Sequence, residues 1–232
     1  MDAVAIITAR GGSKRIPKKN IKEFCGKPII AYSIEAALQS GVFDEVMVST
    51  DSEEIAEVSR KYGAAVPFMR SEGTSNDFAT TADVIEEVVQ DYKAIGKDFD
   101  WLACIYPTAP FVTHDRLSEA MKTVQRADAD SVMTVVRFSF PPQRALIIRD
   151  GKLTYQYPEN AMKRSQDLEP IYHDCGQFYF CKTEAFLAGH SLITSNCVPL
   201  ILPEEEVQDI DNYSDWEIAE SKMMALQKKR AE

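Results

Sequence analysis

The sequence lacks the segments that would place the protein in a membrane or at a metal–thiolate centre. No apolar stretch approaches the roughly 20 residues that a membrane-spanning helix needs. The apolar run at residues 3–7 is short and leads into a charged loop, unlike a signal peptide, so we expect a cytoplasmic protein without a membrane partner. The cysteines are widely spaced, form no CxxC pair and have no zinc spacing with histidine, so we expect free thiols at Cys25, Cys104, Cys175, Cys181 and Cys197.

The sequence also lacks an excess of positive charge. It has 36 acidic and 26 basic residues, for a formal net charge of -10. General nucleic-acid binding needs a broad basic surface, so we expect no nucleic-acid partner. Against this acidic background, five cations gather within ten positions: Arg10, Lys14, Arg15, Lys18 and Lys19.

This basic segment follows a short β-branched strand and contains Gly11, Gly12 and Pro17, which prevent a regular helix or strand. It has neither the spacing of a Walker loop nor that of a dinucleotide-binding GxGxxG loop. Exposed backbone amides and fixed cations suit an anion with several phosphates, and they would stabilise charge that grows on a pyrophosphate leaving group. The alternative is a solvated basic loop.

Strand and helix patterns alternate along the first 137 residues. Such alternation predicts a single α/β domain over residues 1–232, with a mostly parallel sheet flanked by helices. Ligands in such sheets bind beyond the carboxyl ends of the strands, where residues 10–20, 50–51 and 106–110 would lie. The predicted strands are 3–7, 45–50, 64–68, 100–106 and 131–137, and the predicted helices are 29–40, 51–62, 81–95 and 115–126, with a polar loop at 70–80.

Residues 138–172 interrupt the alternation. Turn signals and a predicted hairpin around Asp150-Gly151 indicate a small β-rich insertion, either a flap or an oligomerisation arm. Strands at 174–181 and 197–202 and a helix at 214–230 complete the prediction.

Several polar residues outside the basic loop are candidates for chemistry. Asp209 and Asp211 could hold Mg²⁺, although residues 211–214 could instead cap the last helix. Arg70 and the 75–81 segment could contact a nucleotide base and ribose, or form a polar surface loop. Arg164 could bind a carboxylate in bidentate fashion, or be an exposed charge. His173 and its neighbour Asp174 suggest an acid–base pair, but adjacent strand residues point to opposite faces.

These segments together resemble the CMP-sugar synthetases, the cytidylyltransferases of acidic keto sugars. The resemblance runs nearly end to end and rests on ITARGGSKRIPKKNI (7–21), GKPIIAYS (26–33), VSTDSEEIA (48–56), PFMR (67–70), YPTAP (106–110) and DID (209–211). It implies a Rossmann-like nucleotidyltransferase fold and an enzyme that uses CTP and Mg²⁺. It also implies a homodimer whose arms complete each other's sites.

Two segments depart from the sialic acid branch of that family. Tyr106 stands where the sialic acid enzymes carry Gln, and HDCGQFY (173–179) replaces their Asn-Gly-Ala-Ile-Tyr segment. SNDFATT (75–81) and YHD-x-GQFY (172–179) instead resemble the pseudaminic acid cytidylyltransferases. The resemblance therefore implies transfer of CMP to a nine-carbon acidic keto sugar, with pseudaminic acid as the expected substrate. Another nonulosonate (legionaminic or sialic acid), another nucleoside triphosphate and a nucleotide-sugar sensor without turnover remain alternatives.

The resemblance assigns expected roles to individual residues. We expect nucleotide contacts from Arg10, Gly12, Ser13, Lys14, Lys19, Asn20, Arg70 and Thr80. We expect Mg²⁺ at Asp209 and Asp211, and catalytic contributions from Arg10, Lys14 and Asp211. The expected sugar contacts are Tyr106, Arg164, Gln166, His173 and Gln177.

Overall fold

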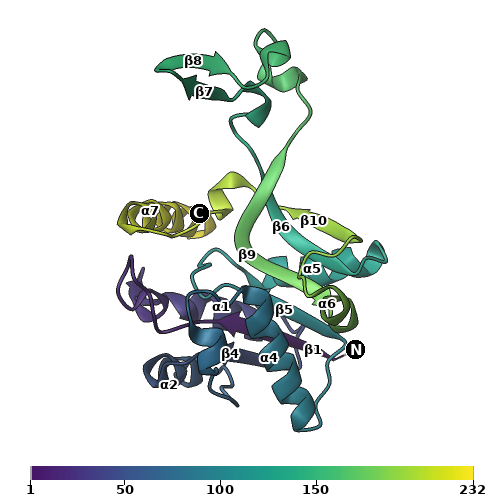
Figure 1. Ribbon diagram of the computed structural model, residues 1–232. Helices are drawn as coiled ribbons and strands as arrows, with labels where there is room; N and C mark the ends of the chain where they lie inside the picture. The colour runs from purple at the N-terminus through teal and green to yellow at the C-terminus, as the bar shows by residue number, and fades with distance from the viewer. Residues whose placement is uncertain (1, 232) are drawn as a thin grey trace.

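A computed structural model describes residues 2–231 of the chain. At its centre is a six-stranded sheet in the order β10-β6-β9-β5-β1-β4 (Figure 1). Five strands are parallel, and only β9 runs antiparallel, between β5 and β6. The strands are β1 (Ala3–Thr8), β4 (Glu45–Ser49), β5 (Trp101–Ile105), β6 (Ser131–Arg137), β9 (Tyr172–Lys182) and β10 (Cys197–Ile201). The predicted α/β fold with a mostly parallel sheet is therefore confirmed.

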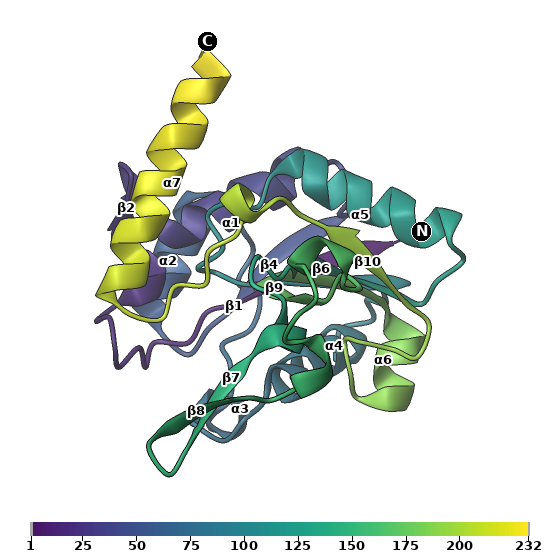
Figure 2. The ribbon, with the colours of Figure 1, turned by 90° about the horizontal axis from the view of Figure 1, so that it is seen from above.

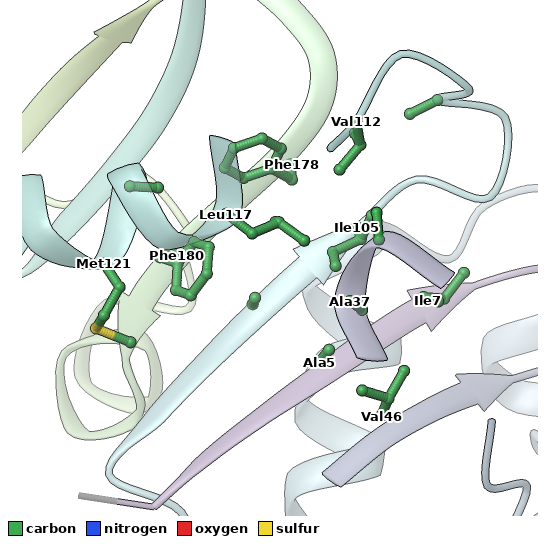
Figure 3. Packing of buried hydrophobic residues seen from close by; sticks show 14 of the residues in the cluster. Ala5, Ile7, Ala37, Val46, Ile105, Val112, Leu117, Met121, Phe178 and Phe180 are labelled. Atoms are coloured by element: carbon green, nitrogen blue, oxygen red, sulfur yellow. The ribbon is translucent and has the colours of Figure 1, made fainter. Parts of the chain in front are cut away.

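Helices cover both faces of this sheet, as the view in Figure 2 shows. Alternate residues of β1 explain the layers: Ala5 and Ile7 belong to the core beneath α1 and α5, whereas Val4 and Ile6 belong to the core beneath α4 and α6. Figure 3 shows the first of these cores, in which Leu117 of α5 and Phe180 of β9 take part. The helices are α1 (Ile29–Gln39), α2 (Glu53–Lys61), α3 (Glu72–Ser75), α4 (Thr81–Ala94), α5 (His114–Arg126), α6 (Thr183–Gly189) and α7 (Tyr213–Ala231).

The predicted strand at residues 64–68 is wrong. Only a single parallel bridge, between Met47 and Ala65, joins this segment to the edge of the sheet. Pro67 has no N–H to donate to a ladder, so the pairing that begins at Ala65 does not continue as a strand. The sequence prediction also missed α3 inside the expected polar loop, the short helix α6 and a two-residue hairpin formed by β2 (Glu23–Phe24) and β3 (Lys27–Pro28).

The segment between β6 and β9 forms an arm that projects from the sheet (Figure 1). It contains the hairpin predicted around Asp150-Gly151, formed by β7 (Leu146–Arg149) and β8 (Lys152–Tyr155), with positive φ at both turn residues. Short 3₁₀ turns at Pro142–Arg144, Pro158–Asn160 and Ser165–Asp167 complete it. Because the arm returns the chain without a crossover helix, β9 enters the sheet antiparallel to β6.

A third apolar cluster brings the two ends of the chain together. It combines Ile16 of the basic loop, Phe24 of the small hairpin, and Ile210 and Trp216 beside and within α7. Phe24 and Trp216 meet edge to face, with ring centroids 5.4 Å apart. Ile210 is fully buried, so the two aspartates that flank it are held next to the basic loop.

Within residues 2–231, no helix has both the length and the apolar character needed to cross a bilayer.

Candidate active site

The basic loop lines a pocket of about 410 Å³ beyond the carboxyl end of β1. The lining residues from the basic loop are Arg10, Gly12, Ser13, Lys14, Arg15, Ile16, Lys19 and Asn20. The remaining lining residues are Thr8, Tyr106, Pro107, Thr108 and Asp211. Two hydrogen bonds hold the conformation of the basic loop. Asn20 Nδ2 donates to the carbonyl oxygen of Arg10 (2.9 Å), and the Gly11 amide donates to Asp51 Oδ1 (2.7 Å).

Gly11 has a packing reason to lack a side chain. A Cβ at this position would lie 3.1 Å from the Cβ of Ser52, which begins α2 as its N-cap. The basic loop therefore packs closely against the segment that follows β4. This packing holds Arg10 and Lys14 in the lining of the pocket.

An acidic residue faces these cations. Asp77 accepts from Arg10 Nη1 (3.0 Å) and from Lys14 Nζ (2.5 Å), and Arg10 also donates to the carbonyl oxygen of Asn76. The hydrogen bond and charge of Lys14, with the charge of Arg10, lower the pKa of Asp77. A phosphate group that entered the pocket would compete with this carboxylate for the same two cations. The sequence analysis placed Asp77 only within a polar segment, because nothing local pairs it with residues more than sixty positions away.

The two aspartates flanking Ile210 lie at the opposite side of the basic loop. Asp211 Oδ1 is 2.7 Å from Arg15 Nη2, and Lys19 Nζ donates to the Ile210 carbonyl oxygen (2.8 Å). Burial, followed by the charge of Asp211, raises the pKa of Asp209. Burial lowers the pKa of Lys19, although both aspartates act against it.

Capping of α7 does not use the Asp211 carboxylate. Asn212 Oδ1 accepts from the amides of Ser214 (2.8 Å) and Asp215 (3.1 Å), and the Asp215 carboxylate accepts from the amides of Asp211 and Asn212. The capping reading of this segment therefore applies to Asn212 and Asp215. The Asp211 side chain faces the pocket instead.

The donor set near Asp209 and Asp211 fits a magnesium ion that is completed by substrate. Among residues 2–231, no three His, Cys, Asp or Glu side chains gather in a way that could hold a metal ion by themselves. Mg²⁺ commonly takes one or two carboxylates, with substrate phosphates and water filling the other positions. Asp209 and Asp211 are two carboxylates that repel each other beside a basic pocket, and they meet that description.

A second pocket, of about 550 Å³, adjoins the first at Tyr106, which lines both. Asp211 lines the first pocket, and Asp209 lines the second. The other polar residues that line the second pocket come from β6 and the residues just after it, from β9, from the segment before α7 and from α7 itself: Arg137, Ser139, His173, Asp174, Tyr179, Glu204, Gln208 and Lys222. Of these, Tyr179 stood in the sequence only within the YHD-x-GQFY segment, and Arg137 and Lys222 were expected only as parts of a strand and a helix.

The structure separates the residues expected to contact the sugar. Tyr106 and His173 line the second pocket, and the His173 Nδ1 lies 2.9 Å from the Asp174 carbonyl oxygen rather than its carboxylate. Gln177 is buried, donates to the Glu206 carbonyl oxygen (2.6 Å) and is not among the lining residues of either pocket. Arg164 and Gln166 lie on the arm, where Arg164 pairs with Asp167 (2.8 Å).

Arg70 and Thr80, expected to contact the nucleotide, are not among the residues that line the first pocket. Arg70 Nη2 donates to the Ser49 carbonyl oxygen (2.6 Å) and Nε to Ser49 Oγ (3.0 Å), and burial lowers its pKa. Thr80 caps α4 through a reciprocal pair of contacts with Asp83. Arg70 therefore contacts the end of β4 and Thr80 the first turn of α4, and neither side chain lines the pocket.

The chain is similar to known proteins in both sequence and fold. Residues 4–199 match the family model described as "Cytidylyltransferase". The chain is 41% identical to the pseudaminic acid cytidylyltransferase of Campylobacter jejuni (serotype O:2) over 220 residues, covering 94% of this chain and 95% of that protein. It is 36% identical to the CMP-N,N'-diacetyllegionaminic acid synthase of Legionella pneumophila, with 97% of each chain covered.

A solved structure of CMP:2-keto-3-deoxy-manno-octonic acid synthetase complexed with CTP has the same fold. The TM-score is 0.70 at 18% sequence identity, over 98% of this chain and all of that one. The match of the family model over most of the chain and the extent of the sequence relatives lead to one conclusion: the chain belongs to the cytidylyltransferase family of nucleotidyltransferases.

Proposed function

We propose that the protein transfers CMP from CTP to the anomeric hydroxyl of a nine-carbon acidic keto sugar, with pseudaminic acid as the substrate. The observation that carries this proposal is the junction of two pockets at Tyr106. One pocket is lined by the cations of the basic loop, and the other is roomy and polar. The two aspartates stand one on each side of the junction.

In this proposal the triphosphate lies in the first pocket. Arg10, Lys14 and Lys19, with the loop amides at Gly12 and Ser13, hold the phosphate oxygens. Asn20, Arg70 and Thr80 act on the cytidine side, Arg70 and Thr80 as supports of the pocket edge. Charge develops on the departing pyrophosphate, and Arg10 and Lys14 stabilise it there more strongly than in the ground state.

The sugar lies in the second pocket, with its anomeric oxygen at the junction. That oxygen attacks the α-phosphorus in line, the bond from the α-phosphorus to the bridging oxygen of the leaving pyrophosphate breaks, and the hydroxyl proton is released. Asp209 and Asp211 would hold Mg²⁺, which when bound supplies positive charge to phosphate oxygens and lowers the pKa of a bound hydroxyl. Asp211, lining the nucleotide pocket, contributes directly to this step.

Self-association is part of the same proposal. The arm exposes large apolar side chains, among them Phe140, Ile148, Leu153 and Met162, which are between 70% and 96% exposed. Apolar groups gathered on one projecting element indicate a contact surface. A second copy that covers them would bring Arg164 and Gln166 of its arm toward a sugar pocket.

The choice of sugar rests on the sequence relatives. The identity of 41% to a pseudaminic acid enzyme supports pseudaminic acid, while 36% to a legionaminic acid enzyme keeps that sugar as the second candidate. A nucleotide-sugar sensor is the other alternative, and the intact cationic loop and aspartate pair argue against it.

The test is pyrophosphate release with each of the four nucleoside triphosphates and a panel of nine-carbon keto acids in Mg²⁺. We expect release with CTP and pseudaminic acid, and its loss by orders of magnitude in Asp211→Ala while the circular dichroism spectrum is unchanged. CTP binding without pyrophosphate release for every sugar would favour the sensor.

A further inference from the structure

The strand that returns from the arm carries an irregularity at the second pocket. Val135 of β6 pairs with Asp174 of β9, and Met133 of β6 pairs with Tyr179 of β9. The two pairs are therefore two residues apart on β6 but five residues apart on β9. The three extra residues (five minus two) form a bulge in which Gly176 has φ +61°. A positive φ of this kind favours glycine.

The bulge changes which side chains share a face. In a regular strand, residues five apart point to opposite faces, since the side-chain period is two. Because the bulge absorbs an odd number of residues, Asp174 and Tyr179 come to the same side. Bulges next to active sites re-aim side chains in this way.

The result is a fixed carboxylate in the wall of the pocket. Asp174 Oδ2 accepts from the Tyr179 hydroxyl (2.5 Å) and Oδ1 accepts from the Gly176 amide (2.8 Å). Tyr179 is buried, and this burial raises the pKa of its hydroxyl, so it stays protonated and donates. Its ring meets that of Tyr106 edge to face, with centroids 5.8 Å apart, which fixes it beside the junction of the two pockets.

Each carboxylate oxygen can accept more than one hydrogen bond. The protein supplies one contact to each oxygen, and Asp174 remains solvent-exposed in the pocket. Its charge is opposite to that of two cations that also line the pocket, Arg137 and Lys222. The pocket can therefore receive a ligand that carries an anion at one end and hydrogen-bond donors elsewhere.

We propose that Asp174 determines which sugar the enzyme accepts, by taking a hydrogen bond from an N–H or O–H donor of the sugar, and that Tyr179 is a positioning residue for its carboxylate. This inference rests on the proposed function, because it assumes that an acidic keto sugar occupies the second pocket. A site built around a charged acceptor disfavours a ligand that lacks the donor, since the remaining acceptor positions of the desolvated carboxylate are then left unfilled.

The experiment is steady-state kinetics of pyrophosphate release for wild type, Asp174→Asn, Asp174→Ala and Tyr179→Phe, with CTP and sugar varied separately. Loss of a hydrogen bond to a charged group predicts a rise in KM for the sugar of roughly 10- to 100-fold in the two Asp174 variants. KM for CTP should change less than about twofold. Tyr179→Phe should raise KM for the sugar by a smaller factor, because Gly176 still holds the carboxylate.

Two further measurements separate recognition from structural damage. The control Asp130→Asn removes a carboxylate that pairs with Lys182 at the far end of β9 (2.8 Å), and it should leave both KM values unchanged. A sugar analogue that lacks one N–H or O–H donor at a time should lose kcat/KM with wild type, and for one donor that loss should disappear in Asp174→Ala.

The outcomes distinguish this inference from the proposed function. If wild type releases no pyrophosphate with any acidic keto sugar, the proposed function fails. If wild type is active but Asp174→Asn and Asp174→Ala keep the wild-type KM for the sugar, the inference is overturned and the function stands. Equal increases in both KM values would also overturn it, because Asp174 would then act on the shape of the whole site.

Discussion

Ile210 offers a quantitative test of how the two aspartates that we propose to hold Mg²⁺ are positioned. Its side chain is fully buried in the cluster that joins the basic loop to α7, with Ile16 and Trp216. Asp209 and Asp211 flank it, so its packing fixes the position of both carboxylates. Shortening this one side chain should therefore weaken the fold and the metal site together.

The magnitude follows from the cost of buried cavities. Ile210→Val should lower the free energy of unfolding by about 0.5–1.5 kcal/mol, and Ile210→Ala by about 2–5 kcal/mol. For a chain of this size, the Val variant should melt roughly 1–6 °C below wild type. If about half of a loss of about 3 kcal/mol in the free energy of unfolding also weakens Mg²⁺ binding by the two carboxylates, Ile210→Ala should need on the order of tenfold more Mg²⁺ for half-maximal activity.

The matched control is Ile29, which is equally buried in the same cluster but begins α1 and adjoins no aspartate. Urea unfolding and Mg²⁺ titration of pyrophosphate release should be measured for Val and Ala variants at both positions. We expect similar losses of stability at the two sites and a shifted Mg²⁺ requirement only at Ile210. An equal Mg²⁺ shift in the Ile29 variants, or none at Ile210, would refute the reasoning.

Three other predictions concern the loop, the thiols and the arm. Asp77→Asn should lower KM for CTP by roughly 2- to 10-fold, since the phosphates no longer compete with a carboxylate for Arg10 and Lys14, and a higher KM would contradict this. Burial raises the pKa of the Cys104, Cys175 and Cys181 thiols from 9.0 to about 12. The folded state therefore holds these protons more tightly than the unfolded state. Their contribution to stability is full below pH 9 and is lost as the pH rises toward 12, so urea midpoints should fall over that window, and midpoints that stayed level would count against it. The double variant Ile148→Asp and Leu153→Asp should abolish self-association in light scattering without changing the melting temperature, whereas a persistent dimer would exclude the arm as the contact surface.

The sequence predicted the parts of the molecule that depend on local pattern. β1, the glycine-rich basic loop and the helices α1, α2, α4 and α5 follow from short-range periodicity and from turn residues. The failure at residues 64–68 has a local cause too, because apolar composition was read as a strand although Pro67 limits pairing. The short helix α6 gave too few residues for a periodic signal.

The site could be predicted only in part, because most of its second pocket is assembled by tertiary structure. Arg137 and Lys222 lie on different elements, at the end of β6 and within α7, and only folding brings them to one wall. Asp77 reaches Arg10 across 67 positions. Gln177 was expected in the pocket from its place in a motif, but the bulge at Gly176 leaves its side chain buried against Glu206. Alternation in a regular strand could not reveal that bulge.

Product analysis tests the central claim most directly. Mass spectrometry of reactions containing the protein, CTP, Mg²⁺ and pseudaminic acid should detect a CMP–sugar conjugate together with pyrophosphate. The conjugate should be absent when Asp211→Ala replaces wild type. Unchanged CTP and free sugar after prolonged incubation with every acidic keto sugar of the panel would contradict the account.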